Sequence, residues 1–534
     1  MGAIESIASA PATERALQAG APRPAQSIRG ATSVAIDFAV AAGGRVASTL
    51  LSFLTVLMTT RMLGPRGYAT VALVGVVASL LFTTSTAWTG VSVRRYGRED
   101  LERSGELSRL TWNRVVIGLP ITIMASAAIV ALRFLDLIPS SFSWPLVGLA
   151  LSTGLATIIV DHWVCLLETS GRFKVSAAGQ VLSQAGYVGA IAFLFVSASH
   201  GSPTVVLSLV LASTVTLAIG LAPFVWRRGV VPVSVDAQLL RRMLWLSAPM
   251  IGLMVAQYVL ASVDVIVLRM FRSQTDVGVY AVAYQAYTVL SAAAISVTAV
   301  LTPLFVSLRM AGRQNLVEGY IRSATPQALL VIACGFALVI PTVSLMVPVV
   351  FGDSFSAATE PLAILVVGLA FLFAAYLVAP ILTLYEQTRA IALFTCVAAV
   401  INVVGDVVML GVLHMGIEAP AVATDAGLLY LFLAFFWRAR RLLGVATRPP
   451  LRFAAPLVVG LVSVLALNDR AGVAAGFAAV LLTSTAVIVW HCPFRAEDLA
   501  LIEKLELPVP VKAIAVKAIA RLARQRSRLD SAVS

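Results

Sequence analysis

Long runs of apolar residues alternate with short polar or basic stretches over most of this sequence. A run of about twenty apolar residues is long enough to cross a bilayer as a helix. Such runs predict helices over residues 33–60, 68–93, 111–135, 144–167, 174–198, 203–226, 243–270, 277–308, 327–351, 358–385, 389–413, 418–437, 452–468 and 472–491. The pattern therefore predicts an all-α polytopic integral membrane protein with about fourteen transmembrane helices.

The composition supports this interpretation and argues against a soluble fold. Of the 534 residues, 59% are hydrophobic and 12% are charged, whereas about a quarter of the residues in soluble domains are charged. A formal net charge of +13 is also found in proteins that bind nucleic acid, but here the basic residues lie between the apolar runs. Membrane topology explains that placement, so no nucleic-acid partner is predicted.

Lysine and arginine are distributed unequally between the two sets of alternate loops. One set contains most of them, and the other contains only Arg61, Arg66, Arg133, Arg269, Arg272 and Arg470. Cytoplasmic loops carry the excess of basic residues, so the basic set is predicted to be cytoplasmic. Both chain termini then lie in the cytoplasm, which requires an even number of helices.

Two motifs occur twice, each time six helices apart. "TTRMLGPRGYATVAL" (59–73) resembles "VLRMFRSQTDVGVYAVAY" (267–284), and "LLETSGRFKVSA" (166–177) resembles "LYEQTRAIAL" (384–393). An even offset preserves orientation, so the two halves are predicted to be parallel repeats, as in one class of secondary transporter. In the first motif glycine permits a tight turn, and tyrosine suits the membrane interface.

The repeats divide the chain into six predicted parts. These are a disordered cytoplasmic tail (1–31), a six-helix bundle (32–226), a cytoplasmic linker (227–242), a second six-helix bundle (243–440), two extra transmembrane helices (441–491) and a cytoplasmic tail (492–534). The last part contains "VKAIAVKAIARLARQRSR". This segment fits a basic amphipathic helix on an anionic leaflet, and it fits a solvated charged tail equally well.

Ionisable residues inside a membrane are costly, and they usually face a cavity or a partner. The expected helices contain Asp37, Arg45, Asp161, His162, Asp264, Arg269, Asp406 and Asp425. Arg45 is the most informative because it lies near the middle of its helix. Its planar guanidinium would match phosphate oxygens, but an internal ion pair with Asp37 or another carboxylate fits equally well.

Each of the other charged residues has a structural interpretation beside the functional one. Asp264 lies near the end of its helix, five residues before Arg269, and a structural carboxylate bonded to the neighbouring bundle is favoured over a substrate contact. The neighbours Asp161 and His162 fit a structural pair better than a proton relay. The four cysteines have neither metal-binding nor redox spacing. No metal site and no cofactor are predicted.

Several segments resemble one family of membrane proteins. They are "RMLGPRGYATVAL", "TGVSVRRYG", "LRRMLWLSAPMIG", "SVDVIVLRMF", "FGDSFSAATEPLAIL" and "INVVGDVVMLGVLHMGIEAPAVAT". Through them the chain resembles the polysaccharide-biosynthesis flippases of the multidrug/oligosaccharidyl-lipid/polysaccharide (MOP) exporter superfamily. It departs from that pattern at Ala419-Pro420-Ala421, where the family commonly has Gly-Ala-Ala.

The resemblance implies transport by alternating access. Two six-helix bundles would face each other across a cavity, followed by two extra helices. The substrate would be a polyprenyl-diphosphate-linked oligosaccharide, moved from the cytoplasmic to the periplasmic leaflet of the bacterial inner membrane for lipopolysaccharide or exopolysaccharide biosynthesis. The prenyl tail would stay in lipid near the portals between 33–60 and 277–308 and between 68–93 and 243–270.

The charges and the resemblance together give the candidate site residues. The candidates for substrate binding in the cavity are Arg45, Arg61, Asp264 and Arg269. The candidates for ion coupling are Asp161, His162, Asp406 and Asp425. The expected partners are the lipid-linked oligosaccharide and the bilayer, and other polysaccharide-synthesis proteins are further candidates. The chain is not expected to be an enzyme.

Three alternatives stay open. A multidrug-type cation-coupled antiporter of the same superfamily usually has about twelve helices and acidic cavity residues, as the resemblance implies. A membrane glycosyltransferase, polymerase or ligase would need an acidic metal site or a large outer loop, and the loops contain no Asp-x-Asp or Asp-Asp cluster. A scaffold would recruit other enzymes through the basic tail, and deletion of the tail would then abolish function.

Overall fold

The computed structural model describes residues 31–135, 142–197, 201–445, 451–466 and 470–491. Within these ranges the chain forms helices and turns, and no strand. The tails expected over 1–31 and 492–534 lie outside the ranges, except for residue 31, and so does the basic amphipathic segment.

Most of the main helices follow the apolar runs closely, but the largely polar helix Gly90–Ser104 lies mostly in the loop expected after the run 68–93. They are α2 (Ala31–Ser85), α3 (Gly90–Ser104), α4 (Ser108–Phe134), α5 (Trp144–Thr169), α6 (Phe173–Val196), α7 (Pro203–Gly229), α8 (Ala237–Phe271), α9 (Gln274–Met310), α10 (Gln314–Gly319), α11 (Thr325–Val339), α12 (Val343–Phe351), α13 (Thr359–Leu384), α14 (Thr388–Val407), α15 (Ala419–Leu443), α16 (Ala454–Ala466) and α17 (Arg470–His491). Two short 3₁₀ elements, η2 (Ala87–Thr89) and η5 (Asp353–Ala358), matter for the packing below.

Helix α2 contains both of the first two expected helices. Gly64, with φ of 63°, breaks its helical path just before Pro65, and glycine adopts this positive φ at no steric cost. Before the break, Gly44 lies against Ala177 of α6, and after it Leu81 lies against Gly154 of α5. Helices α5 and α6 are consecutive and joined by a tight turn, so each crosses the membrane once. Because one part of α2 packs along α6 and the other along α5, each part of α2 also makes a membrane pass of its own.

The described helices bear out the predicted fold class. Eleven of them are long and apolar enough to cross a membrane, and α16 and α17 are shorter apolar helices. Because α2 provides two passes, these thirteen helices provide the fourteen membrane passes that the sequence predicts. The protein is therefore an all-α multi-pass membrane protein.

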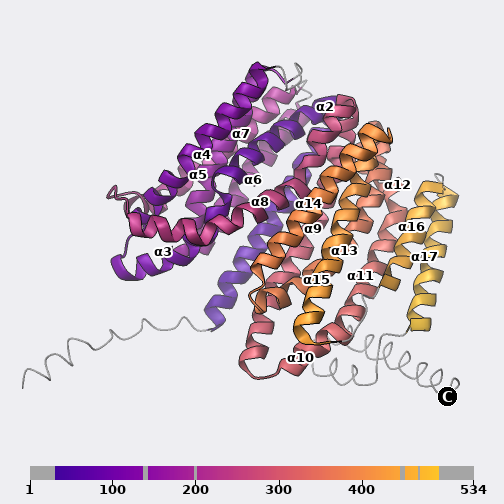
Figure 1. Cartoon of the computed structure of the whole chain (residues 1–534). Helices are drawn as coiled ribbons and strands as arrows, with labels where there is room; N and C mark the ends of the chain where they lie inside the picture. The colour runs from indigo at the N-terminus through magenta and orange to yellow at the C-terminus, as the bar shows by residue number, and fades with distance from the viewer. Residues whose placement is uncertain (1–30, 136–141, 198–200, 446–450, 467–469, 492–534) are drawn as a thin grey trace, which may run out of the picture.

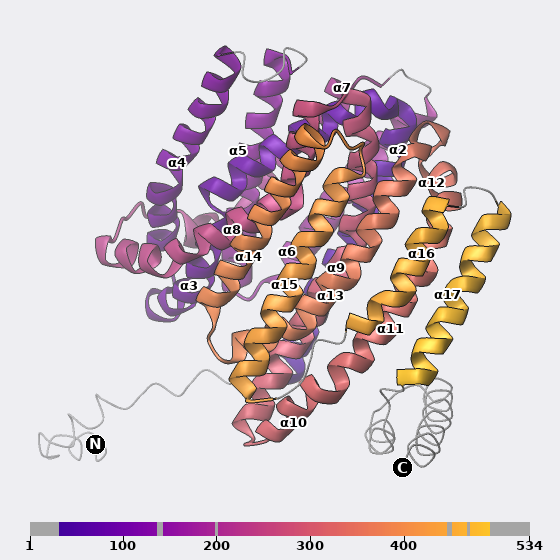
Figure 2. The ribbon, with the colours of Figure 1, turned by 45° about the vertical axis from the view of Figure 1, so that its right-hand side comes forward.

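The helices pack as two lobes and one appended pair, as Figures 1 and 2 show. We call α2–α7 the N-terminal lobe and α8–α15 the C-terminal lobe. Within the first, α2 packs against α5 and α6; within the second, α13 packs against α9 and α15; and the pair α16–α17 packs against α11. The grouping agrees with two bundles followed by two helices, while the residue boundaries of those parts stay a prediction.

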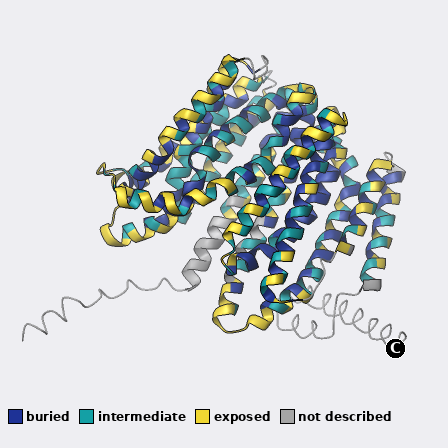
Figure 3. Cartoon of the chain, in the orientation of Figure 1, coloured by how far each residue is buried: buried dark blue, intermediate teal, exposed yellow. Residues whose placement is uncertain are grey.

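Helix α13 forms the centre of the C-terminal lobe. In its most apolar window 94% of the residues are buried, and the largest hydrophobic core runs along it (Figure 3). This burial explains why its sequence is apolar on every side, since a helix without a polar face must be enclosed by other helices or by lipid. The lobe is thus built around one enclosed helix.

The two lobes meet where α2 breaks. Gln274 at the start of α9 donates from Nε2 to Oγ1 of Thr70 at 2.8 Å and to the carbonyl of Arg66 at 3.3 Å. Gly278 on α9 lies so close to Pro65 that a Cβ atom on it would be 1.8 Å from the proline oxygen. Gly278 lies inside α9 and makes no turn, so the turn expected of the motif glycine is wrong here, and the glycine instead permits contact between the lobes. We call this region the Pro65 end.

At the opposite end, which carries most of the arginines, the lobes diverge. Helices α3 and α10 lie far apart in both views (Figures 1 and 2). The first half of α8 bridges the separation by packing against η2, α3 and α4. The Asn113 side chain anchors it, donating to the carbonyl of Asp236 at 3.0 Å and accepting from its amide at 3.1 Å. We call this region the arginine-rich end.

Candidate functional site

Four helices of the C-terminal lobe bring a group of polar side chains together inside its core. Asp264 comes from α8, Tyr280 from α9, Asn402 and Asp406 from α14, and Thr424 from α15. Asp264 is 1% exposed, and Tyr280, Asn402 and Asp406 are fully buried. We call these five residues the acidic cluster.

A chain of hydrogen bonds connects most of the acidic cluster. The Tyr280 hydroxyl donates to Oδ2 of Asp264 at 2.6 Å, and the Thr424 hydroxyl donates to the same oxygen at 2.9 Å. Nδ2 of Asn402 donates in turn to the Thr424 hydroxyl at 3.0 Å. Tyr280 therefore does not lie at a membrane interface, as the sequence suggested for the motif tyrosines. It is a buried hydrogen-bond donor to a carboxylate.

The remaining oxygens of the acidic cluster are buried without a hydrogen-bond donor. They are Oδ1 of Asp264, Oδ1 of Asn402 and both carboxylate oxygens of Asp406, counted among the residues that the structure describes. The carboxyl groups of Asp264 and Asp406 lie close enough for a hydrogen bond when one of them carries a proton. Neither is in an ion pair with a described residue.

Among the residues that the structure describes, none forms an ion pair that compensates these carboxylates. Two neighbouring carboxylates cannot both stay ionised in a membrane interior without compensation. Carboxylate, amide and hydroxyl oxygens are also the ligands that hard cations prefer. The acidic cluster can therefore hold a proton shared by the two carboxyl groups or a small cation bound by its free oxygens.

The predicted arginines lie elsewhere. Arg61, which is exposed, donates from Nε to the carbonyl of Val350 at 3.2 Å and also binds the carbonyl of Val349, so that it ties α2 to the end of α12. Nη1 of Arg269 donates to the carbonyl of Arg272 at 3.3 Å. Arg45 lies on α2, and its side chain is outside the described part of the chain. The structure thus places Arg61 and Arg269 on backbone carbonyls near the Pro65 end.

A second buried charge cluster lies in the N-terminal lobe. Arg114 on α4 is 2% exposed. Its Nη2 lies 2.6 Å from Oδ2 of Asp161 on α5 and its Nη1 lies 3.1 Å from Nδ1 of His162. Its Nε also donates to the Thr89 hydroxyl at 2.8 Å and Nη2 to the carbonyl of Thr86 at 3.2 Å. Arg114 thereby holds the segment where α2 gives way to η2 and α3.

Sequence reasoning missed the role of Arg114 because it counted this residue among the basic residues of a loop. The available signal was its position four residues into the run expected over 111–135, where the side chain of an arginine is already costly to bury. Asp161 and His162 are thus brought together with each other and with Arg114. They belong to the other lobe from Asp264 and Asp406.

Asp425, the last ion-coupling candidate, lies on α15 and faces α13. Its Oδ1 occupies space that a Cβ atom at Gly368 would fill, since the two positions are 2.0 Å apart. The glycine at 368 is therefore needed to admit this carboxylate between the two helices. Burial of a carboxylate against an apolar helix is costly, so Asp425 stays a candidate for ion coupling.

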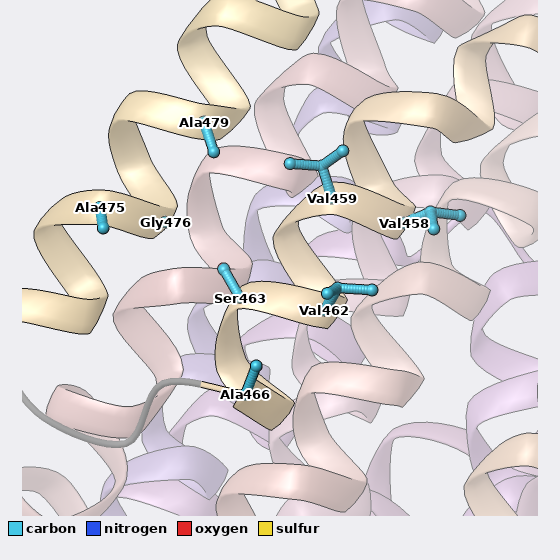
Figure 4. A pocket seen from close by; sticks show the side chains of 8 residues that line it. All are labelled: Val458, Val459, Val462, Ser463, Ala466, Ala475, Gly476 and Ala479. Carbon is cyan, nitrogen blue, oxygen red and sulfur yellow. The ribbon is translucent and has the colours of Figure 1, made fainter.

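The appended pair offers an apolar cavity of about 370 Å³ between α16 and α17. Valines and small residues line it: Val458, Val459, Val462, Ser463, Ala466, Ala475, Gly476 and Ala479 (Figure 4). Gly476 lies close to the Ser463 side chain, where a Cβ atom would be 2.6 Å from the hydroxyl oxygen. The cavity is suited to hydrocarbon, and it lies outside the portals that the sequence suggested for a prenyl tail.

Comparison with known proteins agrees with this architecture. Residues 34–309 match the model of a family described as "Polysaccharide biosynthesis protein". The chain belongs to this family. No curated protein matches the sequence.

Solved structures show which fold the family member adopts. An inward closed conformation of the lipid II flippase MurJ matches with a TM-score of 0.61 at 15% identity, over 83% of this chain and 98% of that chain. An inward-facing multidrug resistance MATE transporter of the MOP superfamily matches with a TM-score of 0.53 at 16% identity, over 74% and 94%. A MATE transporter from Vibrio cholerae matches with a TM-score of 0.52 at 15% identity, over 77% and 98%. These likenesses confirm the MOP fold that the motifs predicted.

Proposed function

We propose that this protein is a flippase that moves a polyprenyl-diphosphate-linked oligosaccharide from the cytoplasmic to the periplasmic leaflet of the bacterial inner membrane. Membership of a polysaccharide-biosynthesis family and a fold shared with a lipid II flippase support this function. The headgroup of such a lipid cannot cross hydrocarbon unaided, because each unpaired polar group costs several kcal/mol there, on the order of 2–7. A protein must therefore enclose it.

The observation that carries the proposal is the unequal contact between the lobes. They are joined at the Pro65 end and diverge at the arginine-rich end. Alternating access needs two rigid bundles that are closed at one end and separated at the other. With the arginine-rich end in the cytoplasm, as the positive-inside rule predicts, this structure represents a state in which the substrate enters from the cytoplasmic side.

Ion coupling is assigned within this proposal to the acidic cluster. Asp406 was a coupling candidate and Asp264 a substrate candidate, and the two are brought together with free buried oxygens. Asp161 and His162 are less suited to release a proton or cation in each cycle, because Arg114 already compensates Asp161. A proton or a small cation that enters and leaves the acidic cluster would drive transport.

Within this proposal Arg45 binds the diphosphate of the substrate. Arg61 and Arg269 are weaker candidates for this role, because they already bind backbone carbonyls. We predict that Arg45→Ala abolishes glycan export while the protein stays in the membrane at a normal level. The measurement is export of the surface polysaccharide beside a membrane blot, with Arg313→Ala, an exposed residue in the turn before α10, as the matched control. Normal export by the Arg45→Ala variant would remove Arg45 from the site.

The flippase function is tested by the leaflet position of the lipid-linked glycan in a deletion strain. An externally added glycosidase reaches only glycan in the outer leaflet. We expect protected glycan to accumulate in the deletion strain and the wild-type gene to restore its exposure. If the strain makes no lipid-linked glycan, the protein acts earlier in the synthesis, as an enzyme or a scaffold. If the glycan is exposed normally in the deletion strain, the protein is not the flippase and the antiporter alternative is favoured.

A further inference from the structure

A groove runs between α6 and α7 of the N-terminal lobe, away from all the residues assigned above. Its volume is about 610 Å³, and one face of each helix lines it, from Val175 to Ala190 on α6 and from Leu209 to Phe224 on α7. Gly186 and Gly220 lie in its walls, and a Cβ atom at either glycine would meet no atom within 4 Å. These glycines therefore leave space open instead of allowing two helices to approach.

The surroundings of the groove are hydrocarbon. Leu182 and Phe193 on α6 are 74% and 73% exposed, and Ile219 on α7 is 67% exposed. In the most apolar window of α6 only 6% of the residues are buried, so lipid must cover most of this helix. An apolar groove in contact with lipid is filled by a chain, because an empty groove would lose its packing contacts and water does not enter the bilayer core.

Basic residues gather at one end of the groove. Lys174 directly precedes the lining residue Val175, and Nη1 of Arg172 donates to the carbonyl of the lining residue Phe224 at 2.7 Å. Arg227 follows three residues after Phe224, and the side chains of Arg172, Lys174 and Arg227 are exposed. Neither α6 nor α7 contains an aspartate or a glutamate. The groove thus combines an apolar length with a positively charged end.

We propose that the groove binds an anionic glycerophospholipid of the surrounding membrane. One acyl chain lies between α6 and α7, and the phosphate headgroup contacts Arg172, Lys174 and Arg227, which are suited to an anionic group at the membrane surface. Besides contacting each other, α6 and α7 pack mainly against α2 and α5 of their own lobe. A resident phospholipid is favoured over the transported lipid because the headgroup of the latter has to enter between the lobes.

The test uses the full-length protein in nanodiscs and two photoactivatable probes, phosphatidylglycerol and phosphatidylcholine with the same diazirine-bearing acyl chain. We expect phosphatidylglycerol to label α6 and α7 peptides about tenfold more than phosphatidylcholine, since two or three cations contact its headgroup. Filling the groove with Gly186→Leu and Gly220→Leu should remove this labelling. Gly189→Leu is the matched control, because a Cβ atom there also meets nothing within 4 Å and the residue does not line the groove.

A second pair of variants tests the headgroup contact without altering the groove. Lys174→Gln with Arg227→Gln removes two of the three headgroup cations and should lower phosphatidylglycerol labelling most of the way to the level of phosphatidylcholine, whereas Arg241→Gln with Arg242→Gln on α8 should leave it unchanged. Equal labelling by the two probes in the wild-type protein would overturn the proposal, as would labelling that persists in the leucine variants. Competition by unlabelled polyprenyl phosphate at lower concentration than by phosphatidylglycerol would also overturn it, since the groove would then serve the transported lipid. If the leucine variants do not purify as a single species, the glutamine variants decide the question.

Discussion

At the residue scale, the neighbours of Asp264 and Asp406 determine which role each carboxylate can have. Each was identifiable in the sequence as a carboxylate inside an apolar run. Only the packing of α8 against α14 shows that they share one site, with Asn402 and Thr424 beside them. The pair has free oxygens and lacks a described cation, which distinguishes it from Asp161, whose charge Arg114 compensates.

Asp406→Asn tests the acidic cluster. The amide keeps the size of the side chain and removes one negative charge, so the need for a coupling ion falls. We expect transport in proteoliposomes to drop at least about tenfold and to lose its response to a pH or sodium gradient, a change of about 1.4 kcal/mol or more in the barrier. Asp353→Asn, an exposed carboxylate in η5, is the control. Unchanged transport with an unchanged ion response would contradict the assignment.

Arg114 lends itself to a stability prediction. Its removal leaves Asp161 without a cation and frees the carbonyl of Thr86. Breaking a buried pair typically costs 3–5 kcal/mol, and since the side chain of Asp161 is 25% exposed we expect Arg114→Met to cost about 2–3 kcal/mol. The midpoint of thermal unfolding in detergent reports this change.

A double variant provides the control for Arg114. Arg114→Met combined with Asp161→Leu removes both charges, so it should recover part of the lost stability, because an apolar pair of similar volume can replace a buried ion pair. If the double variant is less stable than the Arg114→Met variant, the ion pair is not the source of the effect. The hydrogen bonds to η2 would then account for it.

At the scale of elements, the two copies of the first repeated segment serve different purposes. In α2, Gly64, which lies three residues before the motif glycine Gly67, makes the break before Pro65, and in α9 the motif glycine Gly278 is the surface against which that break packs. The sequence repeat therefore marks two elements that contact each other across the lobes. Tyr280 follows Gly278 by two residues and turns inward to Asp264, so one short segment links the contact between lobes to the acidic cluster.

Gly278→Ala tests this contact between elements. The added Cβ atom would lie 1.8 Å from the oxygen of Pro65, so the two lobes must separate there, at a cost of about 1–3 kcal/mol. We expect the variant to fold but to transport at less than about a tenth of the wild-type rate. Gly75→Ala on α2 is the matched control, since a Cβ atom there meets nothing within 4 Å. Equal transport by the Gly278→Ala variant would show that the close contact is unnecessary.

At the scale of the whole molecule, the two lobes are joined by the packing of α2 against α9 and α8. Each has its own packing centre, with α13 enclosed in the C-terminal lobe and α2 against α5 and α6 in the N-terminal lobe. The contact at the Pro65 end includes hydrogen bonds and one close approach, and also apolar packing in which Val56, Tyr68 and Ala69 of α2 join the core of the C-terminal lobe. Motion of whole lobes, the mode of transport that two bundles permit, would therefore have to separate this apolar contact as well.

A cross-link between the lobes tests this motion. Thr70 and Gln274 are hydrogen-bonded across the Pro65 end at 2.8 Å, so cysteines at both positions should be bridged by a short bifunctional methanethiosulfonate reagent when the four native cysteines are replaced. We expect the bridge to stop transport and its reduction to restore it, with each single-cysteine variant unaffected. Transport that continues in the fully cross-linked protein would exclude opening at this end.

The fold was largely predictable because the determining signals are local. A run of apolar residues must cross the membrane as a helix whatever its neighbours are, since an unpaired backbone in lipid is too costly, and the motifs predicted the fold that the solved structures share. Boundaries were accurate for α4 and α13 and less so for α8, which begins several residues earlier than expected. That extension packs against the other lobe, and no signal local to the segment reports such a contact.

The sequence by itself determined the membrane helices, their repeat, the family and the set of costly charges. The tertiary structure decided which charges meet: Asp264 with Asp406, Arg114 with Asp161, and Arg61 with the carbonyls at the end of α12. It also decided that Gly278 serves contact between lobes and that α6 and α7 leave a groove between them. The physical reason is that helix formation in lipid depends on residues near in sequence, whereas compensation of a buried charge depends on helices that only packing brings together.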